Sequence, residues 1–286
     1  MNQPSIKLIE CPRDAMQGWK NFIPTEKKIE YINSLLKVGF DTIDFGSFVS
    51  AKTIPQMADT KEVIGNLEMG ISDTKLLAII ANLRGAEEAL VFDQIAYLGF
   101  PFSVSETFQQ RNTNSSIHES LRRVEEIQNI CINKNKKLVI YISMAFGNPY
   151  NDLYDEDIVF NWVERLVELD IEIISLADTV GVATPEQVYD MTSYLVESLP
   201  STEVGVHLHS TSDNWHQKLE AAVKAGSKRF DGALKGIGGC PMANDDLVGN
   251  MNTEWMISYF EKNNMATGLN KDALAESLRI AGQIFI

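Results

Sequence analysis

Two histidines, His207 and His209, stand two positions apart in the run V-H-L-H. The residues at 203–209 are rich in β-branched and apolar types, so this run is predicted to be a strand, and side chains two apart on a strand point to the same side. Two imidazoles on one side of a strand can share a cation. A pair of hydrogen-bonded interior histidines is the alternative, and a pattern as short as H-x-H does not decide between them.

Two oxygen-bearing residues far away in the sequence favour the metal. Asp14 stands at the end of the first predicted strand, and Asn250 follows the last one. If the strands close into a barrel, both residues come near the strand that carries the histidines. One carboxylate, two imidazoles and an amide oxygen suit Mg²⁺, Mn²⁺ or another divalent ion. A structural zinc site is disfavoured because its ligands are usually thiolates.

Three charged residues close to these positions are candidates for the catalytic work. Arg13 directly precedes Asp14, and its guanidinium can stabilise oxygen charge that develops in a reaction, such as an enolate next to a thioester. It can equally pair with an interior carboxylate. Asp44 ends the second predicted strand and Asp178 follows the sixth, so each is a candidate proton acceptor or a group that orients metal-bound water. Either can instead hold Arg13 in place.

A glycine-rich loop, G-I-G-G-C-P at 236–241, follows the last predicted strand and carries Cys240. It lacks the Gly-Lys-Ser/Thr ending of a phosphate loop and the G-x-G-x-x-G spacing of a dinucleotide site. We interpret it as a mobile loop that brings the thiol over a bound substrate, with a tight turn and an incidental thiol as the alternative. Together with Cys11 and Cys131, Cys240 makes three widely spaced cysteines, which predicts neither a disulfide framework nor a zinc knuckle.

The scaffold for these residues is an alternation of apolar runs and amphipathic segments along the whole chain. Strands are predicted over 5–10, 41–45, 75–81, 94–100, 137–143, 172–176, 203–209 and 229–233. Helices are predicted near 25–38, 54–67, 84–92, 117–134, 156–169, 185–198, 213–225, 245–263 and 271–283. Eight strands each followed by a helix favour one α/β domain over 1–286, a (β/α)₈ TIM barrel with extra C-terminal helices, over a doubly wound open sheet.

Individual helix ends carry their own signals. Thr25 before Glu26 is predicted to cap a helix, and Gly39 stands where a C-terminal cap belongs. Thr184 followed by Pro185 is predicted to start another helix, since proline lacks only an N–H that the first turn leaves unpaired.

Composition limits the partners. The formal net charge of −14 disfavours a nucleic-acid or anionic-membrane surface, which needs clustered Lys and Arg. With 44% hydrophobic and 22% charged residues the chain is typical of a soluble protein, and it has no apolar run near the roughly 20 residues of a membrane span. The N-terminus does not read as a secretory signal, so a cytoplasmic location is expected.

In the order of its motifs the chain resembles 3-hydroxy-3-methylglutaryl-CoA (HMG-CoA) lyase, a family of barrel metallolyases related to isopropylmalate and homocitrate synthases. The matching segments are C-P-R-D-A-M-Q at 11–17, S-F-V-S-A-K and I-P-Q-M within 47–57, S-E-T-F and N-T-N-S-S-I within 105–117, F-G-N-P-Y at 146–150, S-L-A-D-T-V-G-V-A-T-P at 175–185, H-L-H at 207–209, G-I-G-G-C-P at 236–241 and G-N at 249–250.

The resemblance implies a dimeric (β/α)₈ barrel that cleaves HMG-CoA to acetyl-CoA and acetoacetate, with leucine degradation as the family's pathway. It implies enolate stabilisation by Arg13 and proton transfer by Cys240, and His207 is also a candidate proton shuttle. The positions implied to hold Mg²⁺ or Mn²⁺ are Asp14, His207, His209 and Asn250. The positions implied to bind the acyl-CoA are Gln17, Lys20, Tyr141 and Ser175, and Asp178 lies with Ser175 in the family's active-site strand segment as a catalytic candidate.

Some positions depart from the family pattern. The family usually has glutamate at Asp44, aspartate at Ser210, glycine at Ala177, tyrosine at Met242 and small residues at Asp245 and Asp246. Such changes near the metal and the loop can alter the substrate or weaken activity on the standard one. The alternatives are an aldol or Claisen-type enzyme on another acyl-CoA or 2-oxo acid, and a non-catalytic acyl-CoA-binding barrel. Retention of the complete set of chemical groups argues against the last.

Overall fold

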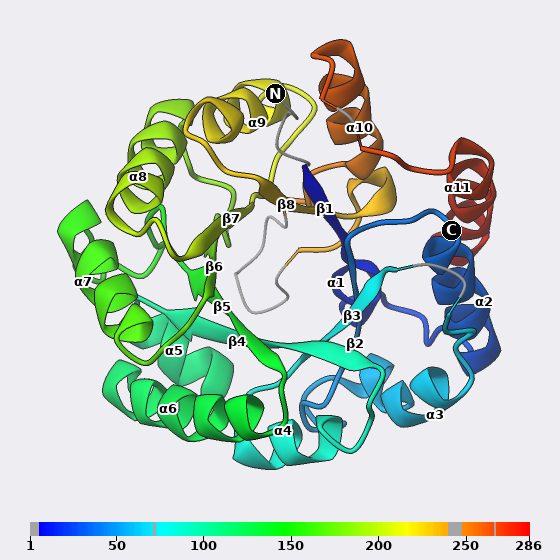
Figure 1. Ribbon diagram of the computed structural model, residues 1–286, viewed down its shortest axis with the longest axis horizontal. Helices are drawn as coiled ribbons and strands as arrows, with labels where there is room; N and C mark the ends of the chain where they lie inside the picture. Colours follow the sequence, from blue (N-terminus) through cyan, green and yellow to red (C-terminus); the bar gives the residue numbers. More distant parts are fainter. Residues whose placement is uncertain (1–5, 71–72, 240–247, 266) are drawn as a thin grey trace.

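The computed structural model describes residues 6–70, 73–239, 248–265 and 267–286. Within these ranges the parallel strands β1 to β8 close into a barrel in chain order, with β8 hydrogen-bonded to β1. Helices surround the strands as an outer ring (Figure 1). The predicted TIM barrel is confirmed, because an open doubly wound sheet would leave two strand edges unpaired.

Most strand and helix bounds lie within a few residues of the predicted ranges. The helix predicted near 54–67 is instead a 3₁₀ turn and a short helix, and of the one predicted near 245–263 the described part is helical only from Thr253. The strands are Lys7–Glu10 (β1), Thr42–Ser47 (β2), Lys75–Ile79 (β3), Ile95–Ser103 (β4), Lys137–Ser143 (β5), Ile173–Ala177 (β6), Glu203–His207 (β7) and Arg229–Gly232 (β8). The helices are Pro12–Gln17 (α1), Thr25–Leu36 (α2), Thr60–Gly65 (α3), Leu83–Ala89 (α4), Glu106–Thr113 (α5), Ile117–Asn133 (α6), Glu156–Val167 (α7), Pro185–Ser198 (α8), Trp215–Lys224 (α9), Thr253–Lys262 (α10) and Lys271–Ile284 (α11), with short 3₁₀ turns at Pro55–Met57 (η1) and Leu234–Gly236 (η2).

The helix α8 begins as its sequence indicates. The Thr184 side chain accepts a hydrogen bond from the backbone of Gln187, whose own side chain bonds back to the cap, and Pro185 fills the first helical position. The prediction for Thr25 is wrong. Pro24 is the N-cap residue of α2, and the Thr25 hydroxyl instead donates a hydrogen bond to Asp59 Oδ2 at 2.8 Å.

Two helices, α1 and α5, were not predicted. α1 is a six-residue turn directly after β1, too short to show a helical period. α5 has the largely polar sequence E-T-F-Q-Q-R-N-T and therefore no apolar stripe. Its start is fixed instead by side chains, because Ser105 accepts from the Phe108 N–H and Asp152 accepts from the Thr107 N–H.

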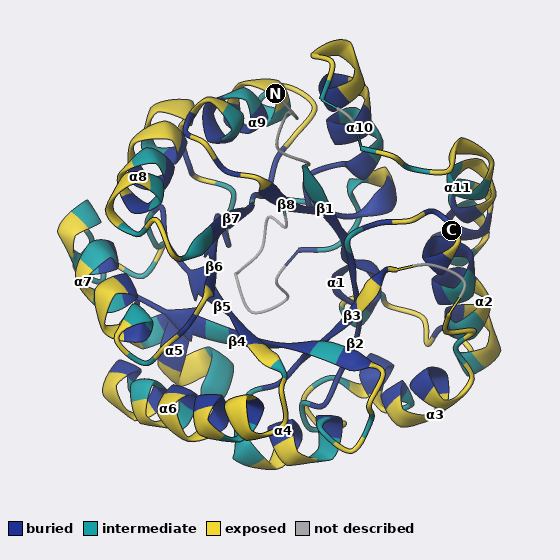
Figure 2. Ribbon diagram, in the orientation of Figure 1, coloured by how far each residue is buried: buried dark blue, intermediate teal, exposed yellow. Residues whose placement is uncertain are grey.

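The core has two layers. Figure 2 shows the strands mostly buried and the helices with both buried and exposed residues. Large apolar side chains fill the space between strands and helices, and a smaller cluster inside the barrel comprises Leu77, Ile79, Tyr97, Val139, Tyr141 and Ile173. The barrel is thus packed below its C-terminal end, and side chains at that end are held on a rigid base.

A buried carboxylate ties the two ends of the barrel sheet together. Glu10, the last residue of β1, accepts hydrogen bonds from the Leu234 N–H at 2.8 Å and from the Thr253 hydroxyl at 2.6 Å. Burial raises the pKa of Glu10 to about 8. The neutral form is therefore favoured in the folded chain relative to the unfolded one.

We predict that Glu10→Gln flattens part of the pH dependence of stability. Because the folded pKa of about 8 lies above the ordinary 4.5, the contribution of Glu10 is complete below pH 4.5 and is lost as pH rises through 8. Thermal unfolding followed from acidic to alkaline pH should show a smaller loss of melting temperature in Glu10→Gln than in the parent. Exposed Glu186→Gln is the control, and parallel curves for Glu10→Gln and the parent would contradict the prediction.

Candidate metal centre and active site

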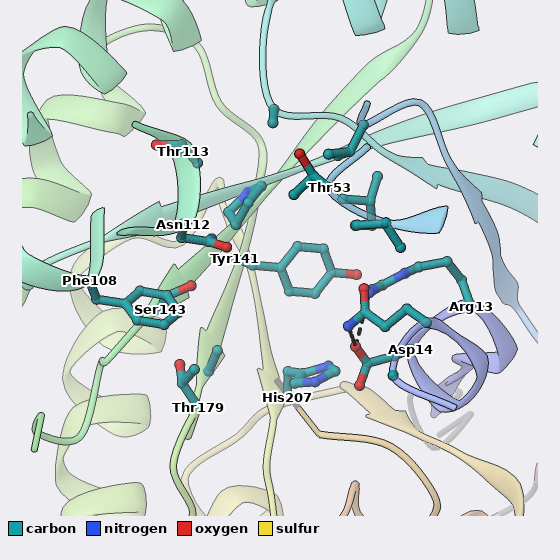
Figure 3. Close-up of a pocket in the computed structure, with 18 of the residues that line it drawn as sticks. Arg13, Asp14, Thr53, Phe108, Asn112, Thr113, Tyr141, Ser143, Thr179 and His207 are labelled. Atoms are coloured by element: carbon teal, nitrogen blue, oxygen red, sulfur yellow. Dashed lines mark hydrogen bonds and ion pairs between the residues drawn. The ribbon is translucent and has the colours of Figure 1, made fainter. Parts of the chain in front are cut away.

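A cavity of about 300 Å³ opens at the C-terminal ends of the strands, where a barrel presents its loops. Its polar lining includes Arg13, Asp14 and His207, which point toward the same space in Figure 3. Its apolar lining includes Ile79 and Phe108. A few converging polar groups in an otherwise apolar hollow are typical of a small-molecule site.

The four predicted metal ligands lie together. Ligand atoms of Asp14, His207 and His209 all fall within 4.8 Å of one another. The Asn250 side-chain amide donates to Asp14 Oδ2 at 2.6 Å and to the Ile237 carbonyl at 2.9 Å, and its own oxygen is buried with no partner among the described residues. A buried acceptor without a donor costs about 1–3 kcal/mol. A divalent cation held by these residues would satisfy that oxygen, so the donor set fits the metal.

Backbone pairing explains how two of these ligands meet. The strand predicted over 203–209 ends at His207, and His209 instead forms an isolated antiparallel bridge with Asn250. The bridge is closed by hydrogen bonds from Ser210 N to Gly249 O and from Met251 N to Leu208 O, both 3.0 Å long. The extension of β7 therefore pairs with the chain beyond β8, which places His209 directly opposite Asn250.

The two histidines have different electrostatic surroundings. His207 Nδ1 lies 3.3 Å from Asp231 Oδ2, a carboxylate contact that orients the ring and leaves Nε2 for a ligand. Burial opposes ionisation of His207, but the bond to Asp231 and the charges of Asp231 and Asp14 raise its pKa above the ordinary value. Burial, His207 and Lys218 together lower the pKa of His209 to about 3. His209 is therefore neutral, as a metal ligand must be.

Arg13 is fixed between two carboxylates. Its Nε lies 3.1 and 3.2 Å from the two oxygens of Asp44, and Nη2 lies 2.5 Å from Asp44 Oδ2. Its Nη1 donates to Asp14 at 2.9 Å, and Gln17 donates to the same Asp14 oxygen at 2.6 Å. Burial raises the pKa of Asp44 to about 6 although Arg13 lowers it. Of the roles considered for Asp44, holding Arg13 is the one that the geometry supports.

Asp178 does not hold Arg13, contrary to one of the two alternatives. Its Oδ2 accepts from Lys218 Nζ at 2.6 Å, and its Oδ1 accepts from the Ala183 N–H at 3.1 Å. Both oxygens are thus engaged, which disfavours the predicted catalytic role. The sequence reasoning missed Lys218, although Lys218, Ala222 and Ala225 share one face of the α9 pattern.

Only some of the residues predicted near the acyl-CoA line the cavity. Tyr141 lines the cavity with its hydroxyl directed toward Arg13 in Figure 3, and that hydroxyl is buried with no partner in the described part of the chain. Gln17 also lines the cavity, whereas Ser175 is fully buried and Lys20 is exposed. Neither Ser175 nor Lys20 is among the described lining residues.

The structure describes only some of the positions that depart from the family pattern. Ala177 lines the cavity, and the buried Ser210 directs its hydroxyl to Met251 Sδ at 3.4 Å. Four positions of interest lie outside the described residues, namely Cys240, Met242, Asp245 and Asp246.

The sequence profile of the HMGL-like family matches residues 6–280. The chain belongs to this family. It is 33% identical over 275 residues to a rat protein named cytoplasmic 3-hydroxy-3-methylglutaryl-CoA lyase, covering 95% of this chain and 79% of that protein. It is 32% identical over 275 residues to bovine mitochondrial hydroxymethylglutaryl-CoA lyase, covering 95% and 83%. The family resemblance drawn from the motifs is therefore confirmed.

Solved structures agree with the family assignment. An HMG-CoA lyase from A. baumannii, determined with coenzyme A and 3-methylmalate, superposes with a TM-score of 0.91 at 32% identity, covering 98% of this HMGL-like chain and 91% of that one. An HMG-CoA lyase from Brucella melitensis gives a TM-score of 0.91 at 28% identity, covering 99% of both chains. Within the described ranges, no helix combines the length and apolar character that crossing a membrane requires.

We predict that Asp14→Ala and His209→Ala each weaken Mn²⁺ binding by about 100-fold or more, since loss of even an outer-shell partner typically costs 10–100-fold. Calorimetric titration of the purified variants measures the effect. His118→Ala is the matched histidine control, because His118 lies on α6 and packs edge-on against Trp162 of α7. Parent-like Mn²⁺ affinity in either ligand variant would refute the ligand assignment.

Proposed function

We propose that this HMGL-like protein is a divalent-metal-dependent carbon–carbon lyase that cleaves HMG-CoA to acetyl-CoA and acetoacetate. The observation that carries the proposal is the cluster of Asp14, His207 and His209 at the mouth of the barrel, beside an Asn250 oxygen that has no donor within the described ranges. Arg13 lies against the same cluster. The curated relatives that it matches are named for this activity.

The reaction needs a group that takes a proton and a group that stabilises a carbanion. Removal of the C3 hydroxyl proton lets the C2–C3 bond break, and its electron pair passes to C2 of the leaving thioester as an enolate. Asp14, His207, His209 and Asn250 would hold Mg²⁺ or Mn²⁺, which when bound polarises substrate oxygen and lowers the pKa of the hydroxyl. Protonation of the enolate carbon then gives acetyl-CoA.

Arg13 stabilises the enolate oxygen. Its guanidinium lines the cavity and is held by Asp44 and Asp14 before any substrate binds. A cation that needs no reorientation during the reaction is the arrangement that electrostatic catalysis favours. The Tyr141 hydroxyl, buried and unpaired within the described structure, is a second donor on the same side of the cavity.

Two residues are proposed to move protons. His207 is proposed to receive the hydroxyl proton on Nε2 when that nitrogen is not bound to the ion, and its contact with Asp231 through Nδ1 stabilises the charged imidazole that results. Cys240 returns a proton to the enolate carbon, and this role stays a prediction.

We also propose a homodimer, a cytoplasmic location and a role in leucine degradation.

An aldol or Claisen-type enzyme on another acyl-CoA or a 2-oxo acid is the second candidate. The departures at Ser210 and Ala177 favour it, because Ala177 lines the cavity and Ser210 follows a ligand. Asp44, where the family usually has the longer glutamate, does not favour this second candidate, because both of its carboxylate oxygens still accept hydrogen bonds from Arg13.

The decisive experiment incubates the purified protein with HMG-CoA and either Mg²⁺ or Mn²⁺ and measures acetoacetate. We expect metal-dependent product that EDTA abolishes and that Asp14→Ala fails to form. Other 3-hydroxyacyl-CoAs serve as comparison substrates. Protein that binds metal yet forms no acetoacetate with either ion would overturn the substrate assignment.

We predict that Arg13→Lys lowers kcat by about 100-fold or more, the usual size of losing one preorganised donor at a developing oxyanion. Lysine keeps the charge but cannot make the two-pronged contact with Asp44. Metal affinity should fall less than kcat, because Arg13 contacts the ligand Asp14 at 2.9 Å without being a ligand itself. Steady-state kinetics beside metal titration tests this, with surface Arg84→Lys as control; an unchanged kcat would remove Arg13 from the mechanism.

A further inference from the structure

Lys218 is a fully buried lysine whose ammonium group reaches three separate segments behind the metal centre. From α9, its Nζ donates to Asp178 Oδ2 at 2.6 Å, to the His209 carbonyl at 3.0 Å and to the Gly181 carbonyl at 3.1 Å. These contacts use all three donors of the ammonium group. A buried ion pair is by itself weak evidence for stability, so the arrangement of its contacts calls for another explanation.

The contact with His209 reaches the backbone of a proposed metal ligand. The bridge to Asn250 uses the N–H of Ser210 and the carbonyl of Leu208. The His209 carbonyl takes no part in that bridge and accepts from Lys218 instead. The ligand segment is therefore held on one side by the chain that carries Asn250 and on the other by Lys218.

The anchor of Lys218 is itself attached to the other histidine. Asp178 accepts from Lys218, and the Asp178 N–H donates to the His207 carbonyl at 3.0 Å. The His209 carbonyl is thus held by the Lys218 ammonium, and the His207 carbonyl by the backbone of Asp178, whose side chain anchors Lys218. In a packed interior such contacts set a side chain to within a fraction of an ångström, the tolerance that a functional site requires.

We propose that Lys218 is a positioning residue for the metal centre, which fixes the His209 backbone so that both imidazoles meet the same ion as Asp14 and Asn250. The inference rests on the proposed metal-dependent function. Lys218 does not line the described cavity and acts only through the residues that it holds. The competing explanation is that Lys218 merely neutralises the buried Asp178.

Lys28 offers a matched control. It is buried to the same 1% exposure as Lys218. Its ammonium group binds Asp59 at 2.8 and 2.9 Å and also the Gln56 carbonyl. Neither partner carries a proposed ligand, so Lys28→Met removes a comparable buried pair away from the metal.

The first test compares Mn²⁺ affinity with thermal stability in Lys218→Met and Lys28→Met. We expect both to melt at lower temperature. Only Lys218→Met should bind Mn²⁺ more weakly, by about tenfold or more, the range seen when partners of metal ligands are removed. The spectrum of bound Co²⁺ should change in Lys218→Met alone. Parent-like Mn²⁺ affinity in Lys218→Met, or an equal loss in Lys28→Met, overturns the proposal.

A second variant separates positioning from charge neutralisation. The double variant Asp178→Asn with Lys218→Met leaves no unpaired buried charge, so it also covers the case in which Lys218→Met alone does not fold. We expect its Mn²⁺ affinity to stay about tenfold below the parent, because the His209 carbonyl still lacks its donor. Recovery of parent affinity would show that Lys218 only neutralises Asp178 and would overturn the proposal.

The failure of this inference is distinguishable from failure of the proposed function. A parent protein that binds Mn²⁺ but forms no acetoacetate overturns the lyase assignment and leaves the positioning role intact. Unchanged Mn²⁺ binding in Lys218→Met overturns only the positioning role. A parent protein that binds no Mn²⁺ overturns both.

Discussion

The site depends on the need to compensate carboxylates that are buried close together. Burial raises the pKa of the Cys11 thiol, and the neighbouring charges of Asp231, Asp44 and Asp14 raise it further. Arg13 lies between Asp14 and Asp44 and compensates part of this charge. The remaining negative charge lies next to two imidazoles and an amide oxygen for which the described part of the chain offers no donor, and it is the electrostatic reason for the centre to attract a cation.

Closure of the barrel brings together residues that are far apart in the sequence. Asp14 and Asn250 are separated by 236 positions, yet they are hydrogen-bonded because β8 closes onto β1. Glu10 reinforces the same junction by bonding the chain beyond β8. Closure of the sheet and assembly of the ligand set are therefore one event, so a change that opens the β1–β8 junction also separates the ligands.

The sequence predicted the parts of the molecule whose signals are local or repeated. Apolar runs of strand length alternate with amphipathic helices, and the resulting barrel brings the carboxyl ends of β1 and β7 to one rim. The short α1 and the polar α5 were missed because their starts depend on tertiary contacts and side-chain caps. The end of β7 was placed two residues late, since His209 continues extended backbone but pairs with a different segment.

Side-chain partnerships were harder to predict than positions. Asp44 and Asp178 looked equivalent because each follows a strand, and only the packing shows that Asp44 meets Arg13 while Asp178 meets Lys218. Lysine is rarely buried without a partner, so its residue type gives no reason to expect Lys218 in the interior. Its helical spacing with small apolar residues was the available signal, and it becomes informative only when that face of α9 is known to pack on the barrel.

The residue after H-L-H bears directly on the metal. Family members usually have an acidic side chain there, whereas Ser210 is neutral and turns to Met251. The Lys218 ammonium that donates to the His209 carbonyl is itself paired with Asp178, so it does not replace the missing negative charge. A neutral residue in place of a negative one weakens the electrostatic attraction for a divalent ion. Strong geometric control of the ligands therefore matters more in this chain, because less of the metal affinity comes from charge.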